Sequence, residues 1–239
     1  VLFRSLSSCS DDGKDSADKD TIVVATSADN PPYEYIQDGK VVGLDIDIMQ
    51  AIAKEMGKKL VIKNFDFPGL LPALTSKNVD AVIAALTITD ERKLRVDFTD
   101  GYASTSMAVL FKKSENLQST NDLTSKTIGV QMGTTWESYA KELAEKMSNI
   151  RVRALSNNLV LLEELKSGGV DALIMEEMQV NKFMSNVAGL SNFTLHDTKG
   201  EFAIALPKDS ALTALMNEAI KKLLLNGSLN EIKAKWLMK

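Results

Sequence analysis

Two segments far apart in this chain have nearly the same sequence. LLPALTSKNVDAVI starts at Leu70 and LLEELKSGGVDALI starts at Leu161, and they agree at eight of fourteen positions without a gap. Each has the apolar spacing of a helix followed by the short β-branched run of a buried strand. Asp80 and Asp171, in the shared VDA, are expected to orient the start of the strand rather than to contact a ligand. A recurring helix–strand pattern would explain part of the match by chance, but the agreement favours two lobes of related α/β architecture.

The residues around both copies continue the alternation of strands and helices. Strands are expected at 21–26, 60–64, 79–86 and 127–130, and helices at 44–56, 69–76 and 134–147. The segment SADNPPYEY is expected to be a loop, since Pro31 and Pro32 disfavour helix in their neighbours. Alternating strands and helices build parallel sheets through right-handed crossovers. We therefore predict an α/β protein in which each lobe is a mostly parallel sheet flanked by helices.

Two further segments are predicted to connect the lobes. Residues 102–113 have the pattern of a strand that leaves the first lobe, and residues 200–208 that of a strand that returns to it, ahead of helices at 211–225 and 229–236. The predicted first lobe is residues 21–106 plus 200–239, and the predicted second lobe is residues 107–199. Clefts between α/β lobes that are joined by such a hinge bind small molecules by closing over them.

The composition excludes several classes of protein. The chain has 239 residues, a net charge of −4 and dispersed Lys and Arg residues, so the basic surface of a nucleic-acid-binding protein is missing. No apolar run reaches about 18 residues, the length that a membrane-spanning helix needs. Cys9 is the only cysteine and His196 the only histidine, which excludes an internal disulfide and argues against a His-based triad or a His-rich metal site. We expect neither a metal nor a cofactor.

The strand expected at 79–86 has the features of a ligand site at its carboxyl end. Ala85 and Thr87 are small or carry a hydroxyl, and Arg92 follows five residues after Thr87. Parallel strands present ligands at their carboxyl ends, and a guanidinium group matches the geometry of a carboxylate. The alternative is an ordinary surface arginine in a cationic turn. The second copy of the repeat ends instead at Glu176, so the two lobes would present complementary charges.

Residues 1–20 differ in composition from the rest of the chain. SSCSDDGKDSADKD is polar and rich in Asp and Ser, so it cannot bury enough apolar surface to fold and is predicted to be a flexible tether. The residues LSSC that end at Cys9 resemble a lipobox, the motif at which a bacterial signal peptide is cut before a cysteine that carries lipid. The preceding VLFRSLSS lacks a full apolar segment, so Cys9 is either a lipid attachment site or a free thiol.

Several pieces of the sequence resemble one known family. They are PPYEY with GKVVGLDIDIMQAIAKEMG, FDFPGLLPALTSKNVDAVIAALTITDERKLRVDFTDGY, IGVQMGTTWESY, VDALIMEE and NGSLNEIKAKW. These pieces are similar to the extracytoplasmic solute-binding proteins that supply polar amino acids to ABC transporters, and among them to glutamine-, arginine- and lysine/arginine/histidine-binding members. The resemblance covers nearly all of residues 21–239 and implies the two-lobed periplasmic-binding-protein fold of type II.

The resemblance also implies roles for residues that bind the α-groups of an amino acid. Arg92 would bind the α-carboxylate, with the hydroxyl and amide of Thr87 and an amide at Thr135. The carbonyl of Ala85 and the carboxylate of Glu176 would receive the α-ammonium group. Enclosing either charge of a zwitterion without a partner costs several kcal/mol, so one cation and one acid from opposite lobes fit such a ligand.

Five further positions match residues of the family that surround the ligand side chain. Phe67 would form a hydrophobic wall, and Gln131 and Met175 would line the second lobe. Ser27 and Asn30 would read the ligand side chain from a loop of the first lobe.

The chain departs from the family pattern at three of these site positions. Glu176 stands where Asp is common, Asn30 where many members have an aromatic residue, and Ser27 where several have an acid. Arginine-specific relatives also tolerate Ser at that position. The ligand is thus left open among four amino acids. Overall likeness to glutamine-binding members favours glutamine, Ser27 and Gln131 favour arginine, and lysine and histidine are further alternatives.

The resemblance implies a monomeric binding protein without catalytic activity. It would capture a polar L-amino acid and pass it to a membrane permease. It would work outside the cytoplasm, in the periplasm or at the cell surface through a lipid anchor on Cys9. The alternative is a cyclohexadienyl- or arogenate-type dehydratase on the same fold, with Glu176 as a general acid. The cleft offers no evident second acid–base group, which argues against this alternative.

Overall fold

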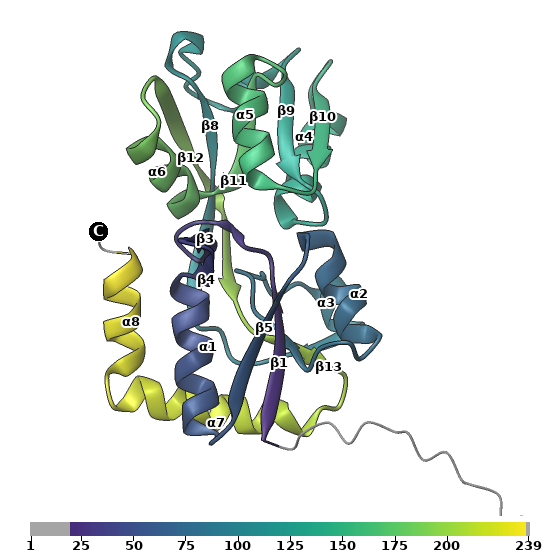
Figure 1. Cartoon of the computed structure of the whole chain (residues 1–239). Coiled ribbons are helices and arrows are strands. Elements are labelled where there is room, and N and C mark those ends of the chain that lie inside the picture. Colours follow the sequence, from purple (N-terminus) through teal and green to yellow (C-terminus); the bar gives the residue numbers. More distant parts are fainter. Residues whose placement is uncertain (1–19, 238–239) are drawn as a thin grey trace, which may run out of the picture.

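The computed structural model describes residues 20–237 and contains two five-stranded sheets, each flanked by helices (Figure 1). A small three-stranded sheet, β2-β3-β4, lies between the first strand and the first long helix along the chain. Among the described residues, no helix combines the length and the apolar character that crossing a membrane requires. The predicted α/β class is confirmed.

The helices and strands have the following bounds. The strands are β1 (Thr21–Thr26), β2 (Asp29–Asn30), β3 (Glu34–Gln37), β4 (Lys40–Val42), β5 (Lys59–Asn64), β6 (Ala81–Val82), β7 (Val96–Phe98), β8 (Ala103–Lys112), β9 (Thr127–Gln131), β10 (Arg151–Leu155), β11 (Ala172–Glu176), β12 (Leu190–Phe202) and β13 (Ala205–Pro207). The α-helices are α1 (Leu44–Glu55), α2 (Leu70–Thr75), α3 (Asp90–Lys93), α4 (Thr135–Lys146), α5 (Asn158–Ser167), α6 (Glu177–Asn186), α7 (Ala211–Leu225) and α8 (Ser228–Leu237). Short 3-10 helices occupy η1 (Phe67–Gly69), η2 (Lys113–Glu115) and η3 (Thr120–Leu123).

The first lobe contains the sheet β5-β1-β6-β13-β7 and has helices on both faces. Strand β1 is parallel to β5 and β6, whereas β13 is antiparallel to β6 and β7. Ile48 of α1 packs in one buried cluster with Val24 of β1 and Ile220 of α7, and Leu70 of α2 packs in another with Val82 of β6. Figure 1 shows the C-terminal helices α7 and α8 beside α1, so the end of the chain completes the lobe that its beginning started.

The second lobe repeats this plan with the sheet β10-β9-β11-β8-β12. Strands β10, β9 and β11 are parallel, and β8 and β12 add antiparallel pairs. A single buried cluster joins Trp136 of α4, Leu161 of α5 and Val180 of α6 to the sheet residues Ile128 and Ile174. Trp136 is therefore part of the core.

Strands β8 and β12 connect the two lobes. Residues 190–195 of β12 pair with residues 107–112 of β8, and residues 200–202 pair with residues 103–105 after a shift of register. The predicted lobe boundaries, between 106 and 107 and between 199 and 200, fall within these two strands. The division of the chain at those residues stays a prediction.

The structure differs from the sequence prediction at the segments that approach the cleft. The strand expected at 79–86 pairs regularly only at Ala81–Val82, and Ala85 has a left-handed backbone with φ of 43°. The predicted loop SADNPPYEY contains β2 and the first two residues of β3, and the predicted strand at 200–208 is divided between β12 and β13. In each case the extent of the strand depends on partners that are distant in the sequence, and the local pattern of residues does not reveal these partners.

Candidate functional site

Arg92 lies at the boundary between the two lobes. The Thr89 hydroxyl caps α3 by accepting a hydrogen bond from the Arg92 backbone N–H at 3.2 Å. The guanidinium donates from Nη1 to the Thr87 carbonyl at 2.6 Å and from Nη2 to the Gly133 carbonyl of the second lobe at 3.0 Å. It also lies 5.8 Å from the centre of the Phe67 ring. Burial lowers the pKa of Arg92 to about 10, so the side chain is still a cation at neutral pH.

A small cavity between the lobes brings six of the ten predicted site residues together. Its lining consists of Asn30, Phe67, Ala84, Ala85, Thr87, Arg92, Thr134, Thr135 and Trp136. Its volume is about 10 Å³, which is about the space that one water molecule needs. The lobes must therefore part before an amino acid enters.

Ala85 is held by the carboxylate of Asp45, in the first turn of α1. The Asp45 Oδ2 atom accepts hydrogen bonds from the Ala85 backbone N–H at 2.7 Å and from the Tyr102 hydroxyl at 2.8 Å. Burial raises the pKa of Asp45 to about 6, against the effect of these donors. This carboxylate therefore anchors the peptide N–H of a residue whose backbone is left-handed.

Glu34 is a second fully buried carboxyl group beside this cavity. Its Oε1 atom accepts a hydrogen bond from Asn30 Nδ2 at 2.9 Å, and Asn30 lines the cavity. Burial and the charge of Asp45 raise the pKa of Glu34 well above its usual range. Both causes favour the neutral form of Glu34. Nothing in the local sequence distinguishes Glu34 from an exposed glutamate of a loop.

Glu176 ends β11 and caps α6. Its Oε2 atom accepts a hydrogen bond from the Gln179 backbone N–H at 3.0 Å, and Thr105 Oγ1 lies 3.5 Å from Oε1. Burial raises the pKa of Glu176 to about 7, although the Gln179 N–H and the Tyr33 hydroxyl favour its charged form. Glu176 borders a neighbouring cavity of about 640 Å³ beside the hinge strands and is not part of the lining around Arg92. Its contact with a ligand ammonium group stays a prediction.

The other three predicted residues lie outside the lining of the Arg92 cavity. Ser27 and Gln131 both hydrogen-bond to Asp29, from Oγ at 3.4 Å and from Nε2 at 3.1 Å. Met175 is buried in the hydrophobic core of the second lobe. Asp29 is the residue that the sequence prediction missed between Ser27 and Asn30. Burial raises its pKa to about 6, partly offset by hydrogen bonds from Asn158 and Gln131.

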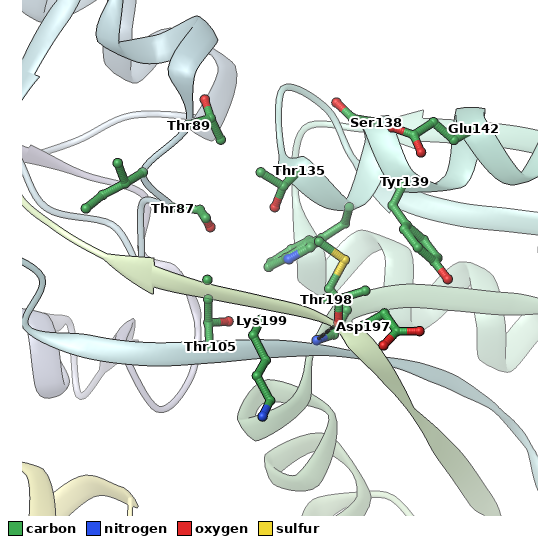
Figure 2. A pocket seen from close by; sticks show the side chains of 14 residues that line it. Thr87, Thr89, Thr105, Thr135, Ser138, Tyr139, Glu142, Asp197, Thr198 and Lys199 are labelled. Carbon is green, nitrogen blue, oxygen red and sulfur yellow. Dashed lines mark hydrogen bonds between the residues drawn. The ribbon is translucent and has the colours of Figure 1, made fainter.

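A groove of about 370 Å³ adjoins the Arg92 cavity and shares Thr87 and Thr135 with it. Figure 2 shows these two threonines on opposite sides of the groove, with Tyr139 and Glu142 farther along it. The cleft therefore continues beyond the carboxylate end of the predicted site. Cys9 lies outside the described residues, so its predicted lipid attachment has no structural counterpart here.

A family model supports the interpretation that the sequence motifs suggested. Residues 22–239 match the model of the bacterial extracellular solute-binding proteins, family 3. The chain belongs to this family. Its two lobes, two-strand hinge and interlobe cavity are the arrangement that a solute-binding protein needs to enclose a small molecule.

Named relatives of this solute-binding protein cover most of its length. The arginine-binding extracellular protein ArtP of Bacillus subtilis (strain 168) is 36% identical over 230 residues, 95% of this chain and 89% of the relative. A probable histidine-binding protein of Campylobacter jejuni is 32% identical over 204 residues, 84% of this chain and 78% of the relative. An ancestral arginine-binding protein bound to arginine has a TM-score of 0.88 at 35% identity, covering 91% of this chain and 98% of the other.

These similarities also decide between a binding protein and an enzyme. A structure described as an ancestral amino acid-binding protein, a precursor of cyclohexadienyl dehydratase, has a TM-score of 0.81 at 30% identity, covering 91% of this chain and 95% of the other. Even this neighbour, whose description names a dehydratase, is itself described as a binding protein. The solute-binding protein is not an enzyme, and its predicted place in amino-acid transport by an ABC transporter is confirmed at the level of the family.

Proposed function

We propose that this solute-binding protein captures a cationic L-amino acid, arginine in the first place, and delivers it to the permease of an ABC importer. An excess of buried acid around the cleft carries this proposal. Asp45 and Glu176 are at most 1% exposed, and no Lys or Arg among residues 20–237 is as deeply buried. A ligand with an additional positive charge relieves this imbalance, whereas glutamine does not.

Each α-group of the amino acid is assigned to residues from both lobes. Arg92, with Thr87 and Thr135, binds the carboxylate, since a guanidinium forms paired hydrogen bonds with two oxygens. Glu176 and the Ala85 carbonyl bind the ammonium group. On opening, the Arg92 guanidinium exchanges the Gly133 carbonyl of the second lobe for the incoming carboxylate.

The side chain of the ligand is assigned to two residues of the predicted site. Phe67 and Asn30 line the cavity, and Phe67 provides an apolar wall for a methylene chain. Ser27, Gln131 and Met175 are not part of this lining. The name of ArtP, an arginine-binding protein, supports a cationic side chain at this place.

We further propose that the protein works as a monomer outside the cytoplasm, in the periplasm or at the cell surface. Lipid attachment at Cys9 would tether it there. Mass spectrometry of the mature protein from its native membrane checks this, because a diacylglyceryl thioether adds a fixed mass at that cysteine.

A screen of the twenty amino acids tests the proposed ligand. Ligands that bind only the native state raise the thermal midpoint by mass action. We expect arginine to give the largest rise, lysine and histidine smaller rises, and glutamine less than any of the three. A larger rise with glutamine than with arginine would refute the charge argument. No rise with any amino acid would refute the proposed function itself.

A further inference from the structure

Asp29 belongs to the first lobe, but most of its hydrogen-bond partners belong to the second. Its Oδ2 atom accepts from the Asn158 backbone N–H at 2.7 Å and from Gln131 Nε2 at 3.1 Å. Its Oδ1 atom lies 3.4 Å from both Asn158 Nδ2 and Gln131 Nε2, and its carbonyl lies 3.4 Å from Gln179 Nε2. We call Asp29, Gln131, Asn158 and Gln179 the Asp29 cluster. Each of its four members is at most 4% exposed.

The cluster supplies the start of α5 with an acceptor that the helix itself lacks. The first N–H groups of a helix have no partner inside it. Asn157 caps α5 by accepting from the N–H groups of Leu159 and Val160, which leaves the Asn158 N–H to Asp29. The positive end of the helix dipole favours a carboxylate at this place. The charge of Asp29 is thus stabilised by the second lobe, without a Lys or Arg partner in the cluster.

The cluster also connects to the residues of the ligand cavity. Gln131 Nε2 donates to the Ser156 carbonyl at 3.1 Å, and the Gln131 carbonyl accepts from Thr134 Oγ1 at 2.6 Å. Thr134 in turn caps α4 and is followed by Thr135, and both line the cavity with Arg92. Closure that brings Asp29 onto Gln131 therefore also places Thr135 over the ligand carboxylate.

We propose that Asp29 is a positioning residue that holds the two lobes closed over the ligand without binding the ligand itself. When the lobes part, the carboxylate exchanges the donors of the second lobe for water. Parting also leaves the N–H of Asn158 without its protein acceptor. The same contacts withdraw Ser27 and Gln131 from the ligand, because the polar atoms of both side chains bond to Asp29. Affinity for every bound amino acid then depends on Asp29, whereas the order of preference among them does not.

Two single variants and their combination test this role. Asp29→Asn keeps the size of the side chain but places a donor NH2 group opposite the donors of the cluster. Asn158→Asp places a second carboxylate opposite Asp29. A carboxylate in the first turn stabilises a helix, so this variant should not destabilise α5. We expect each single variant to weaken binding by about 10- to 100-fold, which is the range for one lost hydrogen bond to a charged group. The double variant pairs an amide with a carboxylate again and should recover most of the loss.

The measurement is calorimetric titration at pH 8 with every amino acid that raises the thermal midpoint in the ligand screen, cationic or not. Asp66→Asn is the matched control, since Asp66 is exposed and borders the same interlobe groove as Asp29. Its affinity should equal that of the wild type. Circular dichroism checks that each variant is folded. If one single variant is unfolded, the double variant is compared with the other single variant.

Three outcomes would overturn the role of Asp29. They are unchanged affinity in both single variants, a double variant no better than the weaker single, and a loss confined to cationic ligands. The last would show that Asp29 reads the ligand side chain. The inference rests on the proposed function for the ligand that is titrated. If the wild-type protein binds no amino acid, the proposed function is refuted; if only the variants behave otherwise than expected, the role of Asp29 is refuted.

Discussion

The two copies of the helix–strand repeat perform the same structural task in the two lobes. In the first copy, the Asp80 Oδ2 atom accepts a hydrogen bond from the Val23 N–H of β1 at 2.8 Å. In the second copy, the Asp171 Oδ2 atom accepts from the Thr127 N–H of β9 at 2.7 Å. Each aspartate therefore joins the start of the strand of the repeat to the neighbouring parallel strand, β1 or β9, and so orients it as the shared VDA led us to expect.

The copies differ where they reach the cleft. After β6 the first copy leaves the sheet, turns through the left-handed Ala85 and leads to the cation Arg92. The second copy continues as β11 to Glu176, whose carboxylate caps α6. The repeat thus builds the scaffold, and the few residues after it give each lobe its charge.

The largest effect is expected from removing the charge of the first lobe. Arg92→Ala should abolish thermal stabilisation by every amino acid, because loss of one partner of a buried, hydrogen-bonded charge pair costs about 2–5 kcal/mol. Arg95→Ala removes an exposed arginine in the same cationic turn and serves as the control. Unchanged affinity in the Arg92 variant would show that the carboxylate binds elsewhere.

A smaller effect is expected from the acid of the second lobe, and it depends on pH. The pKa of Glu176 is about 7, and a ligand ammonium group requires the ionised form. Affinity should therefore rise as the pH increases from 6 to 8, by at most about tenfold per pH unit below the pKa. In Glu176→Gln the affinity should be lower and this part of the pH dependence should disappear. Titration calorimetry at pH 6, 7 and 8 checks both.

The stability of the ligand-free protein should follow the opposite trend. The folded state raises the pKa of Glu176 from 4.5 to about 7, so it binds the proton more tightly than the unfolded chain does. The contribution of this group to the free energy of unfolding is therefore largest below pH 4.5 and falls as the pH rises towards 7. Denaturant unfolding of the wild type and Glu176→Gln across this range measures the difference. A steeper fall in the variant would contradict the assignment.

The smallest effect on binding is expected from the shared aspartates. Asp80→Ala and Asp171→Ala should each lower the free energy of unfolding by about 1 kcal/mol, the net value of a typical hydrogen bond, and leave affinity nearly unchanged. Similar losses would support equal tasks in the two lobes. A loss of affinity in only one variant would show that its copy contributes to the site as well as to the scaffold.

The sequence alone determined the parts of this protein that depend on local periodicity. Apolar spacing predicted α1 and α7 within one residue, the repeat predicted two lobes, and motifs at Ala85, Thr87 and Arg92 predicted one face of the cavity. These features survive in short windows because helix and strand periods, and family motifs, are properties of neighbouring residues.

Only the tertiary structure decided which side chains meet across the cleft. Asp29 lies beside two predicted residues in the sequence, yet its partners Gln131 and Asn158 are far along the chain. Asp45 looks like an ordinary acid at a helix start until the fold places Ala85 and Tyr102 against it. The contacts of Asp29 depend on how the two lobes close, and those of Asp45 on how the first lobe folds, and no local pattern of residues encodes either.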